Sequence, residues 1–141
     1  MDYREAYEKA LQLLNVRFLS EGELKAKLRR RGVDDDVLKD VVAALEGEHF
    51  LDDQRLARDV YRYYARKGQY GHLYIVNRLR RRCLPVPEDV ERPDEYALAG
   101  NLVKRKFSYR ADEACKAARF LQYRGFSPSV IRDVLEDFTV H

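Results

Sequence analysis

Residues 20–45 read SEGELKAKLRRRGVDDDVLKDVVAAL, and this stretch decides the fold. Apolar residues recur on both sides of Gly32 with the spacing of an amphipathic α-helix, which predicts two helices that meet at a corner. Ser20 and Glu23 have the S-x-x-E spacing of a capping box at the start of the first helix. Gly32 suits the left-handed conformation that ends it. The aspartates at positions 34–36 begin the second helix, where the helix dipole favours carboxylates.

The same pattern returns near the end of the chain, where residues 113–138 read EACKAARFLQYRGFSPSVIRDVLEDF. When Gly32 is aligned with Gly125, apolar residues coincide at six positions: Leu28 with Leu121, Val33 with Phe126, Leu38 with Ile131, Val41 with Val134, Val42 with Leu135 and Leu45 with Phe138. The middle of the chain aligns with the same pattern at Leu79, Arg82 and Leu84, and Cys83 stands at the position of the glycine. The chain is therefore predicted to be all-α, with three tandem three-helix repeats and about nine helices, over residues 1–50, 51–93 and 94–141.

Helical spacing also assigns apolar faces to the remaining helices. The first helix carries Tyr3, Ala6, Tyr7, Ala10, Leu13 and Leu14. A helix that starts at Asp52 and Asp53 carries Leu56, Ala57, Val60, Tyr63 and Tyr64, and a further helix, after a break at 68–71, carries Leu73, Ile75, Val76 and Leu79. In the third repeat, helices are expected over 96–107 and 111–123, followed by a last helix with Ser127 as its cap and Pro128 at its first position.

The third helix of the middle repeat is predicted to be shortened. Pro85, Pro87 and Pro93 crowd this segment. Pro87 can open a helix, but Pro93 cannot lie inside it, so the helix runs no further than residues 87–92. Such a short helix is unstable unless packed, and only Val90 is available to pack it. We therefore expect residues 85–95 to be the least protected part of the chain and to act as a hinge before the third repeat.

Several classes of protein are excluded by what the sequence lacks. It has no run of about 18 apolar residues that would span a membrane, and its N-terminus does not resemble a secretory signal. Cys83 and Cys115 lack neighbouring histidines and are expected to be reduced thiols in a cytoplasmic protein. The three histidines are widely separated, and no nucleophile or nucleotide-binding motif is present. Asp52 and Asp53 precede a helix and are interpreted as caps. We expect no enzyme activity, no metal and no cofactor.

Basic residues are gathered in blocks although the net charge is only +3. Residues 53–84 carry a net charge of +7 and residues 100–125 a net charge of +5, whereas residues 33–52 and 85–99 are acidic. The helix dipole explains one or two cations at a helix C-terminus, but in this chain three consecutive basic residues stand at the predicted ends of several helices. The predicted binding residues for a polyanion are Arg29, Arg30, Arg31, Arg62, Arg66, Lys67, Arg78, Arg80, Arg81, Arg82, Lys104, Arg105 and Lys106.

Tyrosines are interleaved with the middle block of basic residues, at positions 61, 63, 70 and 74. Such a pattern occurs on surfaces that stack nucleic-acid bases. Equally, a small core without tryptophan needs tyrosines to fill it. The sequence leaves both interpretations open.

Four segments together resemble the RecX family of bacterial regulatory proteins, which bind the recombinase RecA. They are Ser20-x-x-Glu23-Leu24-x-x-x-Leu28-x-x-x-Gly32-Val33, Phe50-Leu51-Asp52-Asp53-x-Arg55-x-Ala57, Lys67-Gly68-x-x-Gly71 and Arg124-Gly125-Phe126-Ser127. The resemblance covers nearly the whole chain. It implies an elongated, curved array of three three-helix repeats that docks on the RecA–DNA filament and inhibits ATP hydrolysis and strand exchange.

The chain departs from the family pattern at Leu56, at His72 and at Cys83, outside the predicted basic faces. We also expect a monomer that binds single- and double-stranded DNA weakly and without sequence preference. Two other interpretations stay open. A three-helix unit with a basic second helix could be a helix-turn-helix-like regulator that recognises a duplex sequence, although few Asn, Gln or Ser side chains are placed to contact bases. The chain could also be a structural adaptor.

Overall fold

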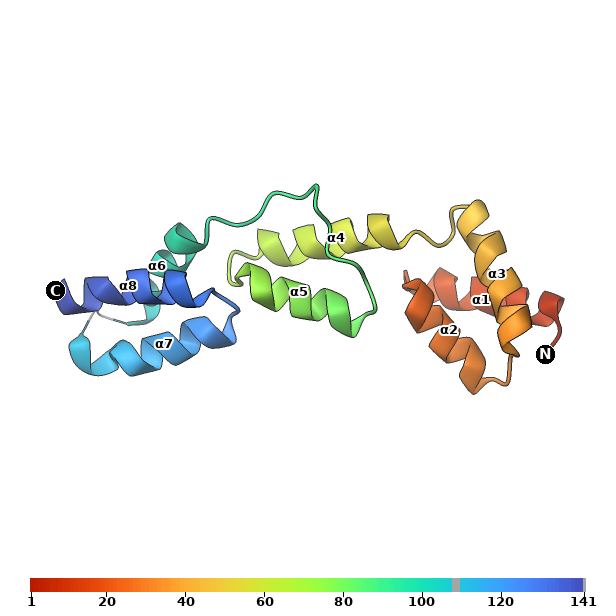
Figure 1. Cartoon of the computed structure of the whole chain (residues 1–141), viewed down its shortest axis with the longest axis horizontal. Coiled ribbons are helices and arrows are strands. Elements are labelled where there is room, and N and C mark those ends of the chain that lie inside the picture. Colours follow the sequence, from red (N-terminus) through yellow and green to blue (C-terminus); the bar gives the residue numbers. More distant parts are fainter. Residues whose placement is uncertain (108–109, 141) are drawn as a thin grey trace. The chain divides into compact units, whose positions relative to one another are not determined.

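The computed structural model describes residues 1–107 and 110–140, the side chains of 139 and 140 excepted (Figure 1). The helices are α1 (Tyr3–Val16), α2 (Glu21–Arg30), α3 (Asp35–Gly47), α4 (Asp53–Arg66), α5 (His72–Arg81), α6 (Glu95–Lys106), the short 3₁₀-helix η1 (Ala111–Glu113), α7 (Ala114–Tyr123) and α8 (Pro128–Val140). This described part contains no β-strand, which confirms the all-α prediction. None of its helices has the length and apolar character needed to cross a membrane.

Residue contacts divide the chain into two compact units. Unit 1 consists of Met1–Asp59 and Leu79–Pro87, and unit 2 consists of Val60–Arg78 and Glu88–His141. Helices α4 and α5 each contribute one part to either unit. The division therefore passes through the middle repeat, and each unit is described by itself below.

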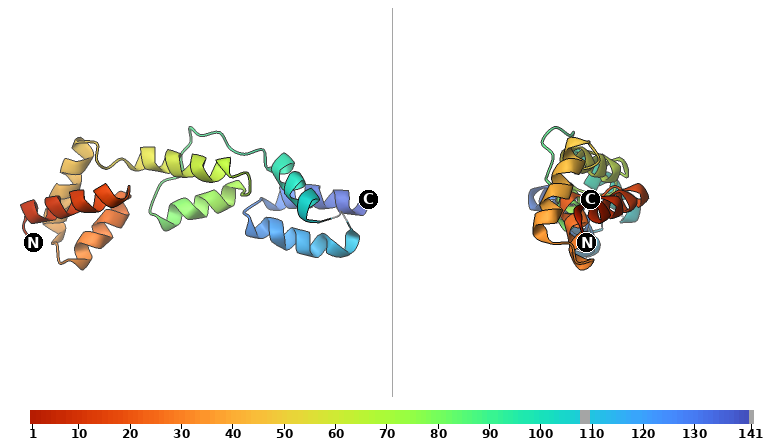
Figure 2. Two further views of the ribbon diagram at one scale, coloured as in Figure 1. Left: turned by 180° about the vertical axis from the view of Figure 1, so that it is seen from behind. Right: turned by 90° about the vertical axis from the view of Figure 1, so that its right-hand side faces the viewer.

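Helices α1, α2 and α3 lie together in unit 1 (Figure 2), and their buried side chains form its core. Leu24 and Leu28 of α2 are fully buried, as predicted from their spacing. They meet residues of α3, where Leu38, Val41 and Leu45 are at most 1% exposed. On α1 the buried residues are alanines, at positions 6 and 10. Burial of an apolar side chain stabilises the folded state by about 1.5–3 kcal/mol, so this cluster holds the three helices together.

The core of unit 2 is formed by α6, α7 and α8. Its buried residues are Ala99, Val103, Ala117, Leu121, Phe126, Val134 and Phe138. The last three lie at positions that the repeat alignment predicted to be apolar. Ser127 also acts as the predicted cap of α8, since its hydroxyl oxygen accepts a hydrogen bond of 3.3 Å from the Val130 amide.

The internal repeat is confirmed at three corners, one at the end of each second helix. Gly32, Cys83 and Gly125 all have a left-handed backbone, with φ values of +85°, +57° and +81°. The amide that follows each of them donates a hydrogen bond to a leucine carbonyl five residues earlier. These bonds join Val33 to Leu28 (3.2 Å), Leu84 to Leu79 (2.9 Å) and Phe126 to Leu121 (3.2 Å). Each corner is therefore a Schellman motif, which satisfies the free carbonyls at the helix end.

The third helix of the middle repeat does not form. Residues 82–94 contain turns and bends but no helix, so the expected helix over 87–92 is wrong. Proline at 85, 87 and 93 removes three amide donors in nine positions, and Val90 alone cannot bury a helical face. The middle repeat consequently contributes two helices, and the described chain has eight α-helices rather than nine.

The predicted apolar face of α4 also needs correction. Tyr63 is 56% exposed, whereas Tyr61 is fully buried. Tyr61 lies four residues after the buried Ala57, on the same helical face, and Tyr63 lies two residues further round. The Tyr61 hydroxyl forms a 2.8 Å hydrogen bond with His72 Nδ1, which pairs the buried polar atom. The sequence left open whether the tyrosines fill the core or stack on bases, and Tyr61 fills the core.

Candidate nucleic-acid interface

In unit 1, the predicted basic residues lie at two helix ends. Arg29 and Arg30 end α2, Arg31 caps it, and Arg80 and Arg81 end α5. All five side chains are exposed. The Nε atom of Arg29 lies 3.1 Å from a carboxylate oxygen of Asp35, in a pair open to solvent. These arginines are therefore available at the surface of unit 1.

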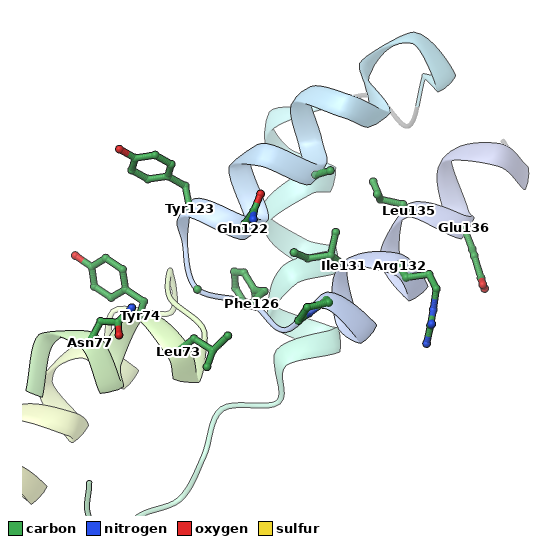
Figure 3. Close-up of a pocket in the computed structure, with 13 residues that line it drawn as sticks. Leu73, Tyr74, Asn77, Gln122, Tyr123, Phe126, Ile131, Arg132, Leu135 and Glu136 are labelled. Atoms are coloured by element: carbon green, nitrogen blue, oxygen red, sulfur yellow. The ribbon is translucent and has the colours of Figure 1, made fainter. Parts of the chain in front are cut away.

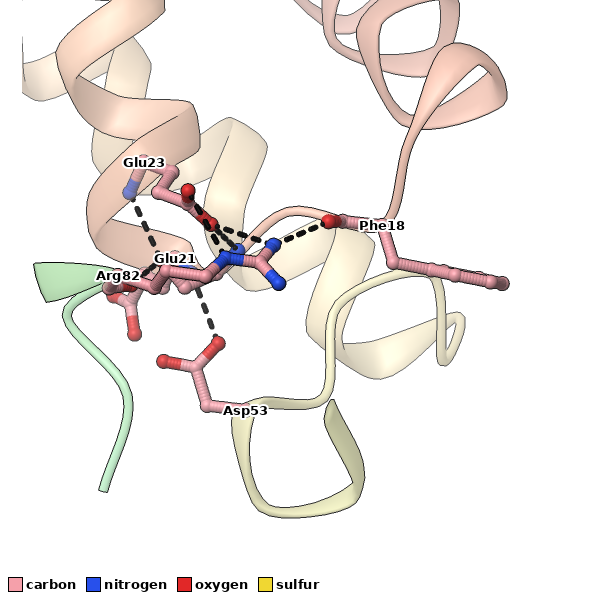
Figure 4. Close-up of polar contacts among 6 residues, drawn as sticks. Phe18, Glu21, Glu23, Asp53 and Arg82 are labelled. Carbon is pink, nitrogen blue, oxygen red and sulfur yellow. Dashed lines mark hydrogen bonds and ion pairs between the residues drawn. The ribbon is translucent and has the colours of Figure 1, made fainter. Parts of the chain in front are cut away.

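Arg82 differs from its neighbours because unit 1 holds its guanidinium (Figure 4). The group donates to both carboxylate oxygens of Glu23, at 3.1 and 3.3 Å, and to the carbonyl oxygen of Phe18 at 2.8 Å. The paired side chains are only 20% and 19% exposed. Burial raises the pKa of Glu23, but the hydrogen bond from Arg82 and a backbone hydrogen bond at Ser20 outweigh it and lower that pKa.

Arg82 thereby anchors the end of α5 to the start of α2. The Ser20 hydroxyl donates a 2.5 Å hydrogen bond to the Arg82 carbonyl oxygen, and Ser20 and Glu23 form the predicted capping box. The structure gives Arg82 a role inside unit 1, and its contact with a partner stays a prediction.

Asp52 and Asp53 cap two different helices. Asp52 accepts a 3.1 Å hydrogen bond from the Arg55 amide in the first turn of α4, as expected. Asp53 accepts a 2.9 Å hydrogen bond from the Glu21 amide at the start of α2 (Figure 4). Burial raises the pKa of Asp53, although the Glu21 amide opposes this rise. In the part of the chain that the structure describes, no three His, Cys, Asp or Glu residues gather as a metal site.

In unit 2, Arg62 and Arg66 are exposed on α4. Lys104, Arg105 and Lys106 are exposed in the last turn of α6. The Nζ atom of Lys106 lies 4.5 Å from the ring centroid of Phe120, and this cation–π contact holds one of the three charges in place. The charges of this set therefore lie on the surface of unit 2.

The remaining predicted cations lie among four tyrosines of unit 2, a group that we call the tyrosine–cation cluster. It comprises Tyr63, Tyr64, Tyr70, Tyr74, Lys67, Arg78 and Arg124. Tyr70 and Tyr74 are stacked, with ring centroids 3.9 Å apart and planes 6° from parallel. The edge of Tyr64 meets each of them at about 6 Å, and Tyr63 meets Tyr64 at 5.1 Å. The rings form one continuous aromatic surface.

Each cation of the cluster lies over an aromatic ring. Lys67 Nζ is 4.7 Å from the centroid of Tyr63, and Arg124 Cζ is 5.5 Å from that of Tyr70. Arg78 Cζ is 5.2 Å from the centroid of Tyr74, whose hydroxyl accepts hydrogen bonds of 3.1 and 2.8 Å from Arg78. Within the described residues, none of the three cations forms an ion pair with a carboxylate.

The pKa values of the cluster reflect these contacts. The hydrogen bond to Tyr63 raises the pKa of Lys67, and the hydrogen bond to Tyr74 raises that of Arg78. Burial would raise the pKa of the Tyr74 hydroxyl, but the hydrogen bonds from Arg78 and Tyr70 lower it overall. The cluster therefore keeps its positive charges at neutral pH without carboxylates that neutralise them.

A groove of about 750 Å³ adjoins the cluster through Tyr74 (Figure 3). Phe126, Ile131 and Leu135 give it an apolar lining, and Leu73 and Pro128 extend that lining. Figure 3 shows Tyr74 and Asn77 projecting from α5, and Gln122 and Tyr123 projecting from the end of α7. Tyr123 is 88% exposed. The groove thus combines an apolar lining with amides, an open aromatic ring and the charged side chains of Arg132 and Glu136.

The sequence-based list missed Arg124, Tyr123, Asn77 and Gln122. Arg124 was visible as the residue that aligns with Arg31 and Arg82, but it stands alone rather than in a basic run. Its place over Tyr70 depends on a tertiary contact, since the Gly71 amide donates a 2.8 Å hydrogen bond to the Arg124 carbonyl oxygen. Composition and spacing carry no signal for that contact.

Comparison with known proteins identifies the first and the third repeat. The model of the first three-helix domain of RecX matches residues 6–45, and the model of its third three-helix domain matches residues 94–135. A regulatory protein RecX from Geobacillus kaustophilus is 29% identical over 99% of this chain, and one from Vibrio cholerae (strain O395) is 32% identical over 96% of it. The chain covers 56% of the Geobacillus protein, about half its length, and 94% of the Vibrio protein.

The solved structures of relatives agree in fold. The crystal structure of RecX from Lactobacillus salivarius matches with a TM-score of 0.84 and 18% identity, over 99% of this chain and 98% of that one. Another crystal structure of a regulatory protein RecX matches with a TM-score of 0.77 and 20% identity, over 95% and 73% of the two chains. Sequence, helix corners and relatives thus agree, and the chain belongs to the RecX family.

Proposed function

We propose that this chain binds filaments of the recombinase RecA on DNA and inhibits their ATP hydrolysis and strand exchange. Membership of a family of regulatory proteins supports a regulatory role. The observation that carries the proposal is the placement of exposed basic residues at the helix ends of all three repeats. A filament of protein and DNA presents a repeated polyanion, and cations on several repeats of one chain can meet it at several points.

The basic residues are proposed to contact the phosphates of the DNA in the filament. Cations that neutralise phosphates release counterions, so binding should weaken as salt rises. Both α2 and α5 end in arginines. Arginine can contact guanine, but neither helix end carries the Asn or Gln that contacts adenine, so these ends offer little discrimination among duplex sequences. The proposal therefore includes binding to single- and double-stranded DNA that is weak and independent of sequence.

Co-sedimentation with RecA filaments on single-stranded DNA tests the proposal. The wild-type chain should sediment with filaments far more than with RecA-free DNA. A variant with Arg30, Arg31, Arg80 and Arg81 replaced by glutamine should sediment less, and it should remain folded because all four side chains are exposed. Equal sedimentation with and without RecA would contradict the proposal. A footprint on one duplex sequence that survives high salt would favour the helix-turn-helix-like regulator instead.

A further inference from the structure

We infer that the tyrosine–cation cluster and the adjoining groove of unit 2 form a binding site for single-stranded nucleic acid, with unpaired bases on the tyrosines and phosphates on the cations. The inference deepens the proposed function, because it assigns one of the contacts made on a filament to particular residues. Single strands are bound elsewhere by this combination of a positive track and aromatic rings.

The charge of the cluster favours a polyanion. Lys67, Arg78 and Arg124 are held by rings and hydroxyls instead of carboxylates within the described chain. A cation over a tyrosine face is stabilised by the ring quadrupole, which holds it in place without cancelling its charge. Three such cations on one surface provide fixed positions for phosphates.

The exposure of the rings favours unpaired bases. Tyr63 is 56% exposed and Tyr123 is 88% exposed, although burial of a tyrosine ring would stabilise the fold. Neither ring is needed to fill the core, which Tyr61 and Phe126 occupy with at most 2% exposure. An exposed aromatic face stacks on any base, and this contact is open to a single strand rather than to a paired duplex.

The groove adds a place for a base beyond the stacking surface. Its volume of about 750 Å³ lies within the range of ligand pockets, roughly 300–1,000 Å³. Asn77 and Gln122 supply amide donors and acceptors that match the edges of bases, and Tyr123 supplies a ring beside them. Arg124 follows Tyr123 in the chain, so a phosphate contact is close to the base contact.

The test measures binding of a fluorescent oligothymidylate to the full chain in the absence of RecA. Tyr63→Ala and Tyr123→Ala should each weaken binding by roughly 5- to 150-fold, which corresponds to about 1–3 kcal/mol of lost stacking. Tyr63→Phe and Tyr123→Phe should bind like the wild type, because stacking requires the ring and not the hydroxyl. Tyr96→Ala is the matched control, since Tyr96 is 50% exposed on α6 and lies outside the cluster and the groove.

Two further measurements separate stacking from charge and from folding. Tyr123→Ala should keep the salt dependence of the wild type and lose little affinity for a duplex, because the Tyr123 ring holds none of the three cations. Lys67→Gln should instead lower the slope of log affinity against log salt by about 0.7, the value for one phosphate of a single strand. Wild-type affinity of both alanine variants for the single strand would overturn the inference, as would an equal loss for single strand and duplex.

The inference and the proposed function can fail separately. If the alanine variants bind the single strand normally but no longer inhibit RecA, the surface holds a protein and the inference is overturned. If the tyrosines are required for single-strand binding but the wild-type chain leaves RecA unaffected, the inference stands and the proposed function fails.

Discussion

At the residue scale, the second helix of each repeat ends in a left-handed residue. Two of the three are glycines, and the third is Cys83. A residue with a Cβ atom is strained in this conformation by roughly 1–2 kcal/mol, whereas glycine is not. The alignment predicted the position of the corner in the middle repeat, and the structure shows that the cysteine adopts the backbone of the glycine that it replaces.

Cys83→Gly is expected to stabilise unit 1 by about 1 kcal/mol, because it removes this strain. Gly32→Ala should destabilise the same unit by a similar amount, since no atom within 4 Å would clash and only the backbone conformation opposes a side chain. Gly47→Ala, at an open position in α3 without a left-handed backbone, should instead be stabilising by about 0.5–1 kcal/mol. Urea denaturation measures all three. A neutral or destabilising Cys83→Gly substitution would contradict the account.

The Glu23–Arg82 pair gives the stability of unit 1 a pH dependence. The pKa of Glu23 is lowered from its ordinary value of 4.5 in the folded chain. The pair therefore contributes its full stabilisation above pH 4.5 and loses it as the pH falls through the lower folded value. In Glu23→Gln the side chain can still serve the capping box but carries no charge.

Urea denaturation over a pH series should show Glu23→Gln less stable than the wild type at neutral pH, with the difference shrinking below pH 4.5. The Asp35→Asn variant is the control, because the Arg29–Asp35 pair is 55% and 80% exposed and should contribute about 1 kcal/mol or less. A constant difference between Glu23→Gln and wild type across the series would show that Arg82 does not stabilise the charged carboxylate.

Sequence patterns predicted the helix caps well, but they did not predict which side chains form tertiary contacts. The capping box at Ser20 and the cap at Ser127 depend on residues within three positions, so spacing is sufficient to find them. Arg82 was grouped with exposed arginines because its partner, Glu23, lies 59 positions away. Arg124 was missed for the same reason. A side chain's partner is set by packing, which a charge count does not contain.

At the element scale, the middle repeat is the exception among the three. Its first two helices form as expected, but its third is replaced by residues 82–94 without a helix. The prolines predicted a shortened third helix, and the structure shows that this helix is absent. Helix nucleation is unfavourable, and Val90 offers too little burial to offset it. The division between units 1 and 2 passes through this segment, between Pro87 and Glu88.

Residues 85–95 should exchange amide hydrogens much faster than Val37–Leu45 of α3. In α3 each amide is held in a helical ladder beside a buried core, whereas no such ladder crosses residues 85–94. Hydrogen exchange followed by mass spectrometry on the full chain makes the comparison. Equal protection of the two segments would contradict both the absence of the helix and the predicted hinge.

At the scale of the whole molecule, three repeats place separate sets of basic residues on one chain. The repeat architecture was predictable because apolar positions and corner residues recur with a fixed offset. The aromatic surface of unit 2 was only half predictable, because the same tyrosine run supplies a core residue, Tyr61, and an exposed one, Tyr63. The proposed function predicts that these sets let one copy of the chain contact more than one RecA subunit.

The rate of DNA-dependent ATP hydrolysis by RecA tests this central claim most directly. RecA is assembled on single-stranded DNA, and the full chain is added at rising ratios to RecA. We predict that hydrolysis falls at well below one copy per RecA subunit, and that the variant lacking Arg30, Arg31, Arg80 and Arg81 requires more protein for the same effect. Unchanged hydrolysis at saturating concentrations of the wild-type chain would contradict the account.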